Sequence, residues 1–117
     1  MSKATHPTRI TLHTGSRTLE VRFDTGEKFQ LPWEYLRVFS PSKEVRGRHG
    51  SGRILVTDKE NVVITEMKPV GNYALKLFFN DGHNSGLYDW DFLYELGVNQ
   101  SKYWQQYQAQ LASQPDA

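Results

Sequence analysis

The sequence contains no cysteine among its 117 residues. Disulfide bonds are therefore impossible, and no thiolate is available to ligate zinc or an iron–sulfur cluster or to attack a substrate. Long apolar runs are missing too, since no stretch approaches the roughly 20 residues of a membrane-spanning helix. Residues 1–9 also lack the apolar core of a signal peptide. We therefore expect a cytoplasmic protein with no membrane association and no bound cofactor.

An excess of either charge sign is also lacking, because 14 Lys and Arg face 13 Asp and Glu, for a net charge of +1. A general nucleic-acid binder carries a clear positive excess, so this balance argues against nucleic acid as a partner. Locally the charges separate, since residues 37–53 are basic with a single acid and residues 80–96 are acidic with no base. Either these two segments face each other or solvent, or the basic segment binds an acidic partner.

Large aromatic side chains are plentiful, with three Trp, six Tyr and six Phe. Each removes a large apolar area from water, which is enough for one hydrophobic core in a chain of this length. No composition shift divides the chain. We predict a single domain over residues 8–112, between flexible tails at 1–7 and 113–117.

Alternation of apolar and polar residues predicts antiparallel strands. Residues 10–12 and 19–23 form a predicted hairpin, and a turn at 24–27 leads to a short strand that carries Phe29 and Leu31. A further strand region over 62–67 is broken at residues 69–72. The clearest alternation covers residues 73–79, and Asn80-Asp81-Gly82-His83 is a strong signal for a tight turn into a last short strand at 85–88.

Three helices are predicted around these strands. Pro32 opens a short one that Pro41 stops, with Trp33 and Leu36 facing inward and Tyr35 at the edge of that apolar stripe. Asp89 caps a helix over 90–96, and Gly97 ends it. A final helix over about 102–112 docks on the body through an apolar stripe. The prediction is an α+β fold of mostly antiparallel strands with short helices packed at one side. The docking residues are Tyr103, Trp104, Tyr107 and Leu111.

Two segments together carry a family resemblance. Residues 31–42 read LPWEYLRVFSPS and residues 79–93 read FNDGHNSGLYDWDFL. This pairing resembles the gamma-butyrobetaine hydroxylase-like N-terminal domain, which occurs in bacteria as a small stand-alone domain of unknown function, and the likeness covers about residues 8–97. In the hydroxylases a separate domain holds the catalytic iron, so the resemblance implies no catalysis by this one.

The resemblance also implies a lost zinc site. In the hydroxylases this domain holds a structural zinc through three cysteines and one histidine, which fall here on Ser40, Ser42, Val45 and His83. A serine hydroxyl is a poor zinc ligand and valine is none, so we predict no metal site, with hydrogen bonds and packing in its place. Similar domains are fused to P-loop ATPases that carry iron–sulfur clusters, which implies an accessory role in cluster assembly.

His83 is the strongest candidate for a catalytic or ligand-binding residue. It lies next to Asp81 and Ser85, but residues so close in one turn rarely point at one another as a catalytic triad requires. Nor does the chain hold a His-x-Asp or His-x-Glu pair for a mononuclear iron site. We therefore predict that His83 braces its turn and contacts residues 40–42, and that the chain is not an enzyme.

These observations favour a monomeric accessory domain that binds another protein, linked to iron–sulfur protein assembly by the resemblance. The alternative is a regulatory domain that binds a small ligand or a metal at His83. The basic stretch 46–53 lacks the Lys-Ser/Thr ending of a phosphate-binding loop, but as an exposed loop it is a candidate protein-binding element. The candidate binding residues are Arg37, Ser40, Ser42, Arg46, Arg48, His83 and Trp90.

Overall fold

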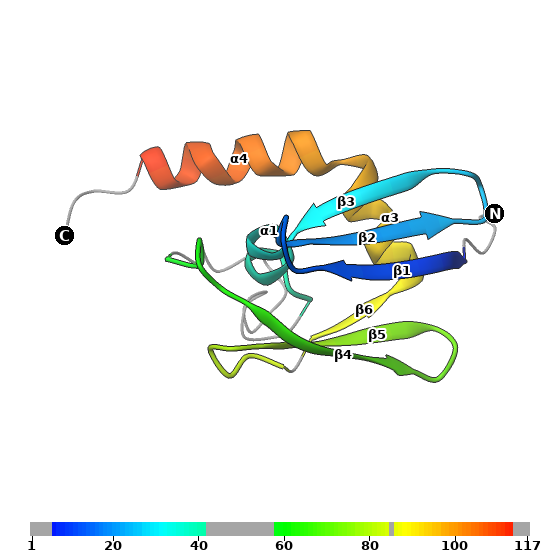
Figure 1. Ribbon diagram of the computed structural model, residues 1–117. Helices are drawn as coiled ribbons and strands as arrows, with labels where there is room; N and C mark the ends of the chain where they lie inside the picture. The colour runs from blue at the N-terminus through cyan, green and yellow to red at the C-terminus, as the bar shows by residue number, and fades with distance from the viewer. Residues whose placement is uncertain (1–5, 42–57, 85, 114–117) are drawn as a thin grey trace.

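The computed structural model describes residues 6–41, 58–84 and 86–113, which form two three-stranded antiparallel sheets and three helices (Figure 1). Sheet A has the order β1 (Pro7–His13), β2 (Thr18–Phe23), β3 (Lys28–Pro32). Sheet B has the order β4 (Ile64–Val70), β5 (Ala74–Phe79), β6 (Leu87–Asp89). The helices are α1 (Trp33–Val38), α3 (Trp90–Val98) and α4 (Gln100–Ala112). The predicted α+β class is confirmed. No helix of the described ranges combines the length and apolar character needed to cross a membrane.

Sheet A follows the predicted alternation. Leu19 of β2 pairs with Leu12 of β1 and Leu31 of β3, and all three lie on the face that turns toward the core. On the opposite face Glu20 pairs with polar residues of both neighbouring strands. Because side chains alternate with a period of two, this register fixes Leu19, Val21 and Phe23 of β2 on one side of the sheet.

Sheet B differs from the prediction on both sides of the turn between β4 and β5. β4 continues through Pro69, which pairs with Leu75, instead of breaking there. β4 is an edge strand, and an edge position tolerates the missing N–H of proline. Tyr73, which the alternation placed in the strand, lies before β5 and is 53% exposed. The turn therefore occupies residues 71–73, later than the sequence suggested.

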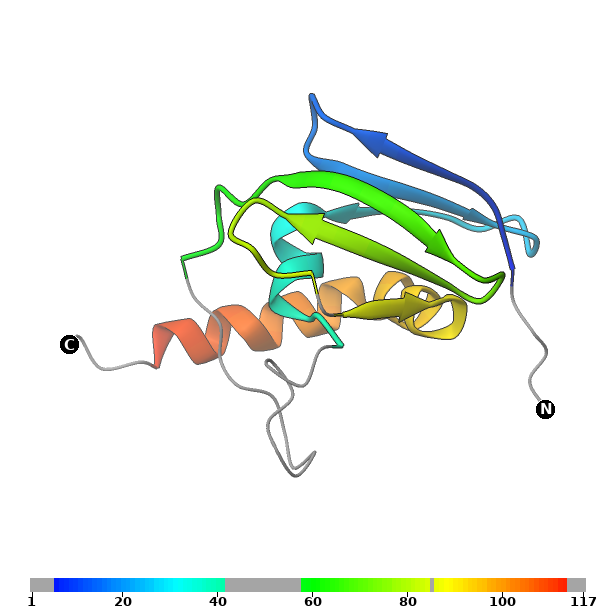
Figure 2. The same ribbon diagram turned by 90° about the horizontal axis from the view of Figure 1, so that it is seen from below.

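α1 lies between the two sheets and α4 (Figures 1 and 2). Trp33 and Leu36 face the core as predicted, but Tyr35 is fully buried and is not at the edge of the apolar stripe. The correction has a tertiary cause, because α4 covers the side of α1 that a two-layer arrangement would leave open. Trp104 of α4 meets the Tyr35 ring edge-on, with 6.0 Å between ring centroids.

Two buried tyrosine hydroxyls tie α1 to its surroundings. The Tyr35 hydroxyl donates to the carbonyl of Leu96 in α3 at 2.7 Å. The Tyr88 hydroxyl of β6 donates to the carbonyl of Leu36 in α1 at 2.6 Å. A buried hydroxyl needs a partner, and each of these finds one on a helix whose backbone it then holds in place.

α3 begins as predicted but ends later. The Asp89 carboxylate accepts from the Phe92 amide at 2.8 Å, which is N-cap geometry. Gly97, predicted to end the helix, lies inside α3, which runs to Val98. A Cβ at position 97 would lie 2.4 Å from Cγ of the Phe29 ring on β3, so this glycine allows α3 to approach sheet A closely.

α4 starts at Gln100, two residues before the predicted start. Tyr107 is buried, and Tyr103 and Trp104 are half-buried against the core. Leu111 is 36% exposed and does not dock as predicted. Figure 1 shows why, since the C-terminal part of α4 extends past the body.

The close approach at Gly97 predicts the effect of an added methyl group. Gly97→Ala forces the Phe29 ring to move, and overpacking of this kind costs about 1–3 kcal/mol, against the roughly 1 kcal/mol that alanine contributes to a helix. We expect a net loss of up to about 2 kcal/mol in the free energy of unfolding, measured by urea denaturation. Gly15→Ala is the control, because a Cβ at Gly15 meets no atom within 4 Å. Equal stability of the two variants would contradict the packing of α3 on β3.

Candidate functional site

A buried polar pair joins the end of α1 to the turn between β5 and β6. Ser40 Oγ and His83 Nε2 form a hydrogen bond of 2.8 Å. Ser40 is fully buried and His83 is 6% exposed. The predicted contact between His83 and residues 40–42 is therefore confirmed at Ser40.

The turn that presents His83 is set by local hydrogen bonds and one glycine. The Gly82 amide donates to the Phe79 carbonyl at 3.0 Å, and the Phe79 amide donates to the His83 carbonyl at 3.1 Å. Gly82 has a φ of +90°, a conformation that glycine adopts without steric cost. The His83 amide donates to the Asp81 carboxylate at 3.1 Å. The predicted Asp-Gly turn is thus closed by its own backbone.

Asp81 is the centre of an ion cluster. Its Oδ2 accepts from Arg37 Nε at 2.9 Å and from Lys59 Nζ at 2.6 Å. Burial alone would raise the pKa of Asp81, but the hydrogen bonds from Lys59, the His83 amide and Arg37 outweigh it and lower the pKa to about 2. The pairing of Arg37 with Asp81 supports the interpretation that the basic and acidic segments face each other.

These bonds join α1 and the residues after it to the turn between β5 and β6, and we call the Ser40–His83 hydrogen bond the buried polar brace. The two reactive side chains, Ser40 and His83, are almost entirely shielded from solvent and are bonded to each other. Within the described ranges no group of three or more His, Asp or Glu side chains could hold a metal ion. The zinc that the hydroxylases hold does not fit the donors present, because a serine hydroxyl is a poor zinc ligand. A hydrogen bond links Ser40 and His83, two of the four corresponding positions.

The other candidate residues have different surroundings. Trp90 is half-buried, and its Nε1 donates to the Asn72 carbonyl at 2.8 Å, which anchors α3 to the turn between β4 and β5. The side chain of Arg37 is only 11% exposed and is committed to Asp81. Ser42, Arg46 and Arg48 lie outside the described residues.

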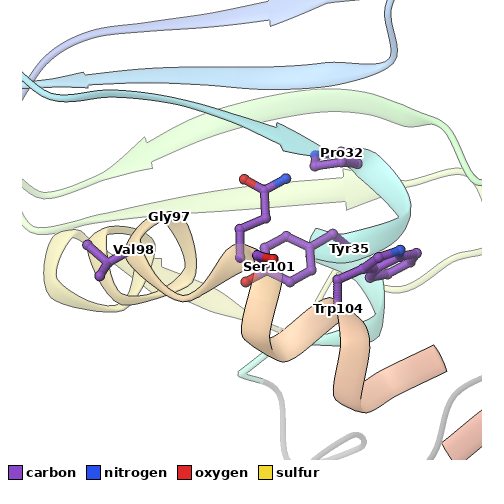
Figure 3. Close-up of a pocket in the computed structure, with 7 residues that line it drawn as sticks. Pro32, Tyr35, Gly97, Val98, Ser101 and Trp104 are labelled. Atoms are coloured by element: carbon purple, nitrogen blue, oxygen red, sulfur yellow. The ribbon is translucent and has the colours of Figure 1, made fainter. Parts of the chain in front are cut away.

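An open groove elsewhere on α1 was not found from the sequence. It has a volume of about 410 Å³ and lies where the β3–α1 junction meets the end of α3 and the start of α4 (Figure 3). Val98 at its rim is 54% exposed. The only sequence signal for it was Val98, an apolar residue after Gly97. That signal is weak, because the groove forms only when α3 and α4 pack beside α1. Its lining residues are Pro32, Tyr35, Gly97, Val98, Gln100, Ser101 and Trp104.

Fold and cluster define a small α+β domain in which the sheets and helices are joined through a buried polar brace. The sequence profile of the family described as "Gamma-butyrobetaine hydroxylase-like, N-terminal" matches residues 10–94. That range is most of the chain, so the protein belongs to this family, as the two segments around α1 and His83 indicated.

Three solved structures are similar over most of their lengths. Two solution NMR structures share 46% and 48% sequence identity with this chain, with TM-scores of 0.81 and 0.82. The matches cover 95% and 96% of this chain and 87% and 83% of the others. A crystal structure from Acidithiobacillus ferrooxidans is 37% identical, with a TM-score of 0.66 over 79% of this chain and 92% of that one. It is a DUF971-family protein of unknown function. No curated protein matches the sequence.

The lowered pKa of Asp81 predicts a pH-dependent contribution to stability. A carboxylate whose pKa is depressed in the folded state stabilises the fold above its ordinary pKa and loses that effect as the pH falls toward about 2. Asp81→Asn should therefore cost about 1–2 kcal/mol at neutral pH, and the difference from the wild type should shrink between about pH 4 and pH 2. Urea denaturation over this range measures it.

Asp24→Asn is the matched control, because Asp24 is an exposed turn residue with no ion pair to a described residue. Its effect should be small at every pH. A deficit of Asp81→Asn that stays constant down to pH 2 would contradict the ion cluster.

Proposed function

We propose that this protein is a non-catalytic accessory domain that binds another protein through the groove at Val98. The observation that carries the proposal is the open apolar groove beside a rigidly held α1. The burial of Ser40 and His83 supports a non-catalytic role, because these two reactive side chains are bonded to each other and are almost entirely buried.

The groove has the composition of a site for an apolar side chain. None of its lining residues is charged. Tyr35 is held by its hydroxyl bond to Leu96, so this wall of the groove is fixed before binding. A preorganised apolar pocket with few polar groups is typical of binding hot spots. Gln100 and Ser101 supply hydrogen-bonding groups along one side, which suits the backbone of an exposed protein segment.

The iron–sulfur link is the finer part of the proposal. It is supported by the resemblance, through the fusion of similar domains to P-loop ATPases that carry clusters. A partner of this kind would place the protein in the cytoplasm, acting as a monomer beside a cluster-carrying protein. The absence of cysteine from this chain means that the partner supplies every thiolate ligand.

A charge placed in the groove should abolish partner binding. In Val98→Glu the carboxylate must be desolvated for a partner side chain to enter, and we expect at least tenfold lower recovery of the partner on immobilised protein, measured by quantitative mass spectrometry of native extract. Leu87→Glu is the matched control, since Leu87 is also an exposed apolar residue, 41% accessible, but lies on sheet B. Equal recovery by the two variants would overturn the groove assignment.

The iron–sulfur part has a separate outcome. We expect the protein lost from the Val98→Glu sample to be a cluster carrier or an assembly factor, and purified cluster-carrying ATPase to bind the wild type and not Val98→Glu. If the lost partner has no connection with iron–sulfur proteins, the groove assignment stands and the iron–sulfur link is wrong.

A further inference from the structure

The outer face of sheet A carries three basic residues in one row across all three strands. The strand register pairs Arg9 of β1 with Arg22 of β2, and Arg22 with Lys28 of β3. All three are exposed. Like charges directly opposite each other in a sheet are destabilising, so this row reduces the stability of the free domain.

One carboxylate, that of Glu20, lies beside the row, and both of its oxygens already have hydrogen-bond partners. Glu20 Oε2 accepts from Arg22 Nε at 2.8 Å, and Glu20 Oε1 lies 2.8 Å from His13 Nε2. Hydrogen bonds from Arg22 and His13 lower the pKa of Glu20 to about 2, so it is ionised at neutral pH. Arg9 and Lys28 make no ion pair with any described residue. The three bases and the one carboxylate therefore leave this face with a net charge of +2.

No described element covers this face. α1 and α3 contact β3, and the apolar residues they pack against are on the inner side of the sheet. Figure 2 shows sheet A at the edge of the molecule, with the described helices all on its other side. Among the described residues nothing therefore blocks this surface from a partner.

We propose that the row Arg9, Arg22, Lys28 binds an acidic segment of a partner protein. The charge of the row requires an anionic partner. Neighbouring strands lie about 4.8 Å apart, so the row spans about 10 Å, which an extended segment crosses in about three residues. Two carboxylates at alternate positions of such a segment can reach Arg9 and Lys28.

The composition of the face favours a protein over other anions. No Trp, Tyr or Phe is among its residues, whereas single-stranded nucleic acids need aromatic rings for stacking. A membrane surface would require large apolar side chains to insert, and the only apolar residue of this face is the half-buried Pro32. The face consists of Arg9, Thr11, His13, Thr18, Glu20, Arg22, Lys28, Gln30 and Pro32.

The test is an NMR titration of the labelled full chain with a ten-residue oligoglutamate peptide at low salt. We expect the amide signals of β1, β2 and β3 around the row to shift, and binding to weaken as salt is added. The variant Arg9→Gln with Lys28→Gln should bind about two- to thirtyfold more weakly, since it removes two exposed ion pairs to the peptide. It should fold with equal or greater stability.

The control variant neutralises a matched basic pair on the other sheet. Lys68 and Lys76 are cross-strand partners on the outer face of sheet B, where both ammonium groups lie over the Phe78 ring. Lys68→Gln with Lys76→Gln should bind oligoglutamate like the wild type, and so should Val98→Glu, because this surface is independent of the groove. Absence of shifts on sheet A, or equal weakening by the two double variants, would overturn the proposal. So would tighter binding of oligothymidylate or of anionic phospholipid vesicles to the same row.

Discussion

The fold depends on how α1 is held. A helix of six residues is too short to be stable alone, so tertiary contacts must supply its stability. Tyr35 extends from α1 to the backbone of α3, and Tyr88 reaches the backbone of α1 from β6. At its C-terminal end the Ser40–His83 hydrogen bond and the Arg37–Asp81 ion pair join it to the turn of sheet B. At its N-terminal end it follows β3 directly.

This arrangement explains which residues remain available for function. The most reactive side chains, Ser40 and His83, are bonded to each other. The resemblance assigns metal ligands to both of these positions. Here a hydrogen bond joins those positions, with the Asp81 ion cluster next to it. The surfaces that stay open are the groove beside Tyr35 and the outer face of sheet A. Both are suited to a protein partner, one by apolar shape and the other by charge.

Much of the fold could be predicted because local signals agreed with it. Alternation located the strands, the Asp81-Gly82 pair located the turn between β5 and β6, and Asp89 marked the start of α3. The contact between His83 and Ser40 was also predictable, since the family resemblance paired these positions.

The features that the sequence did not predict depend on how the helices and strands pack together, and the local sequence pattern gives no information on that packing. Tyr35 is buried because α4 covers it, and a stripe on one helix does not show a second layer. Glycine is typical of a helix end, but Gly97 lies inside α3, where its missing side chain allows the Phe29 ring to pack closely. The groove needs three elements in place, and the basic row needs the strand register, which sets Arg9, Arg22 and Lys28 side by side.

Native-state hydrogen exchange tests the central role of α1 most directly. The Phe39 amide donates to the Tyr35 carbonyl at 3.0 Å and closes the last turn of α1. If α1 joins the two sheets into one cooperative unit, this amide exchanges only by global unfolding, with the same free energy as core amides of β2 and β5. Exchange of the Phe39 amide through a local opening, at a free energy well below that of both sheets, would contradict the account.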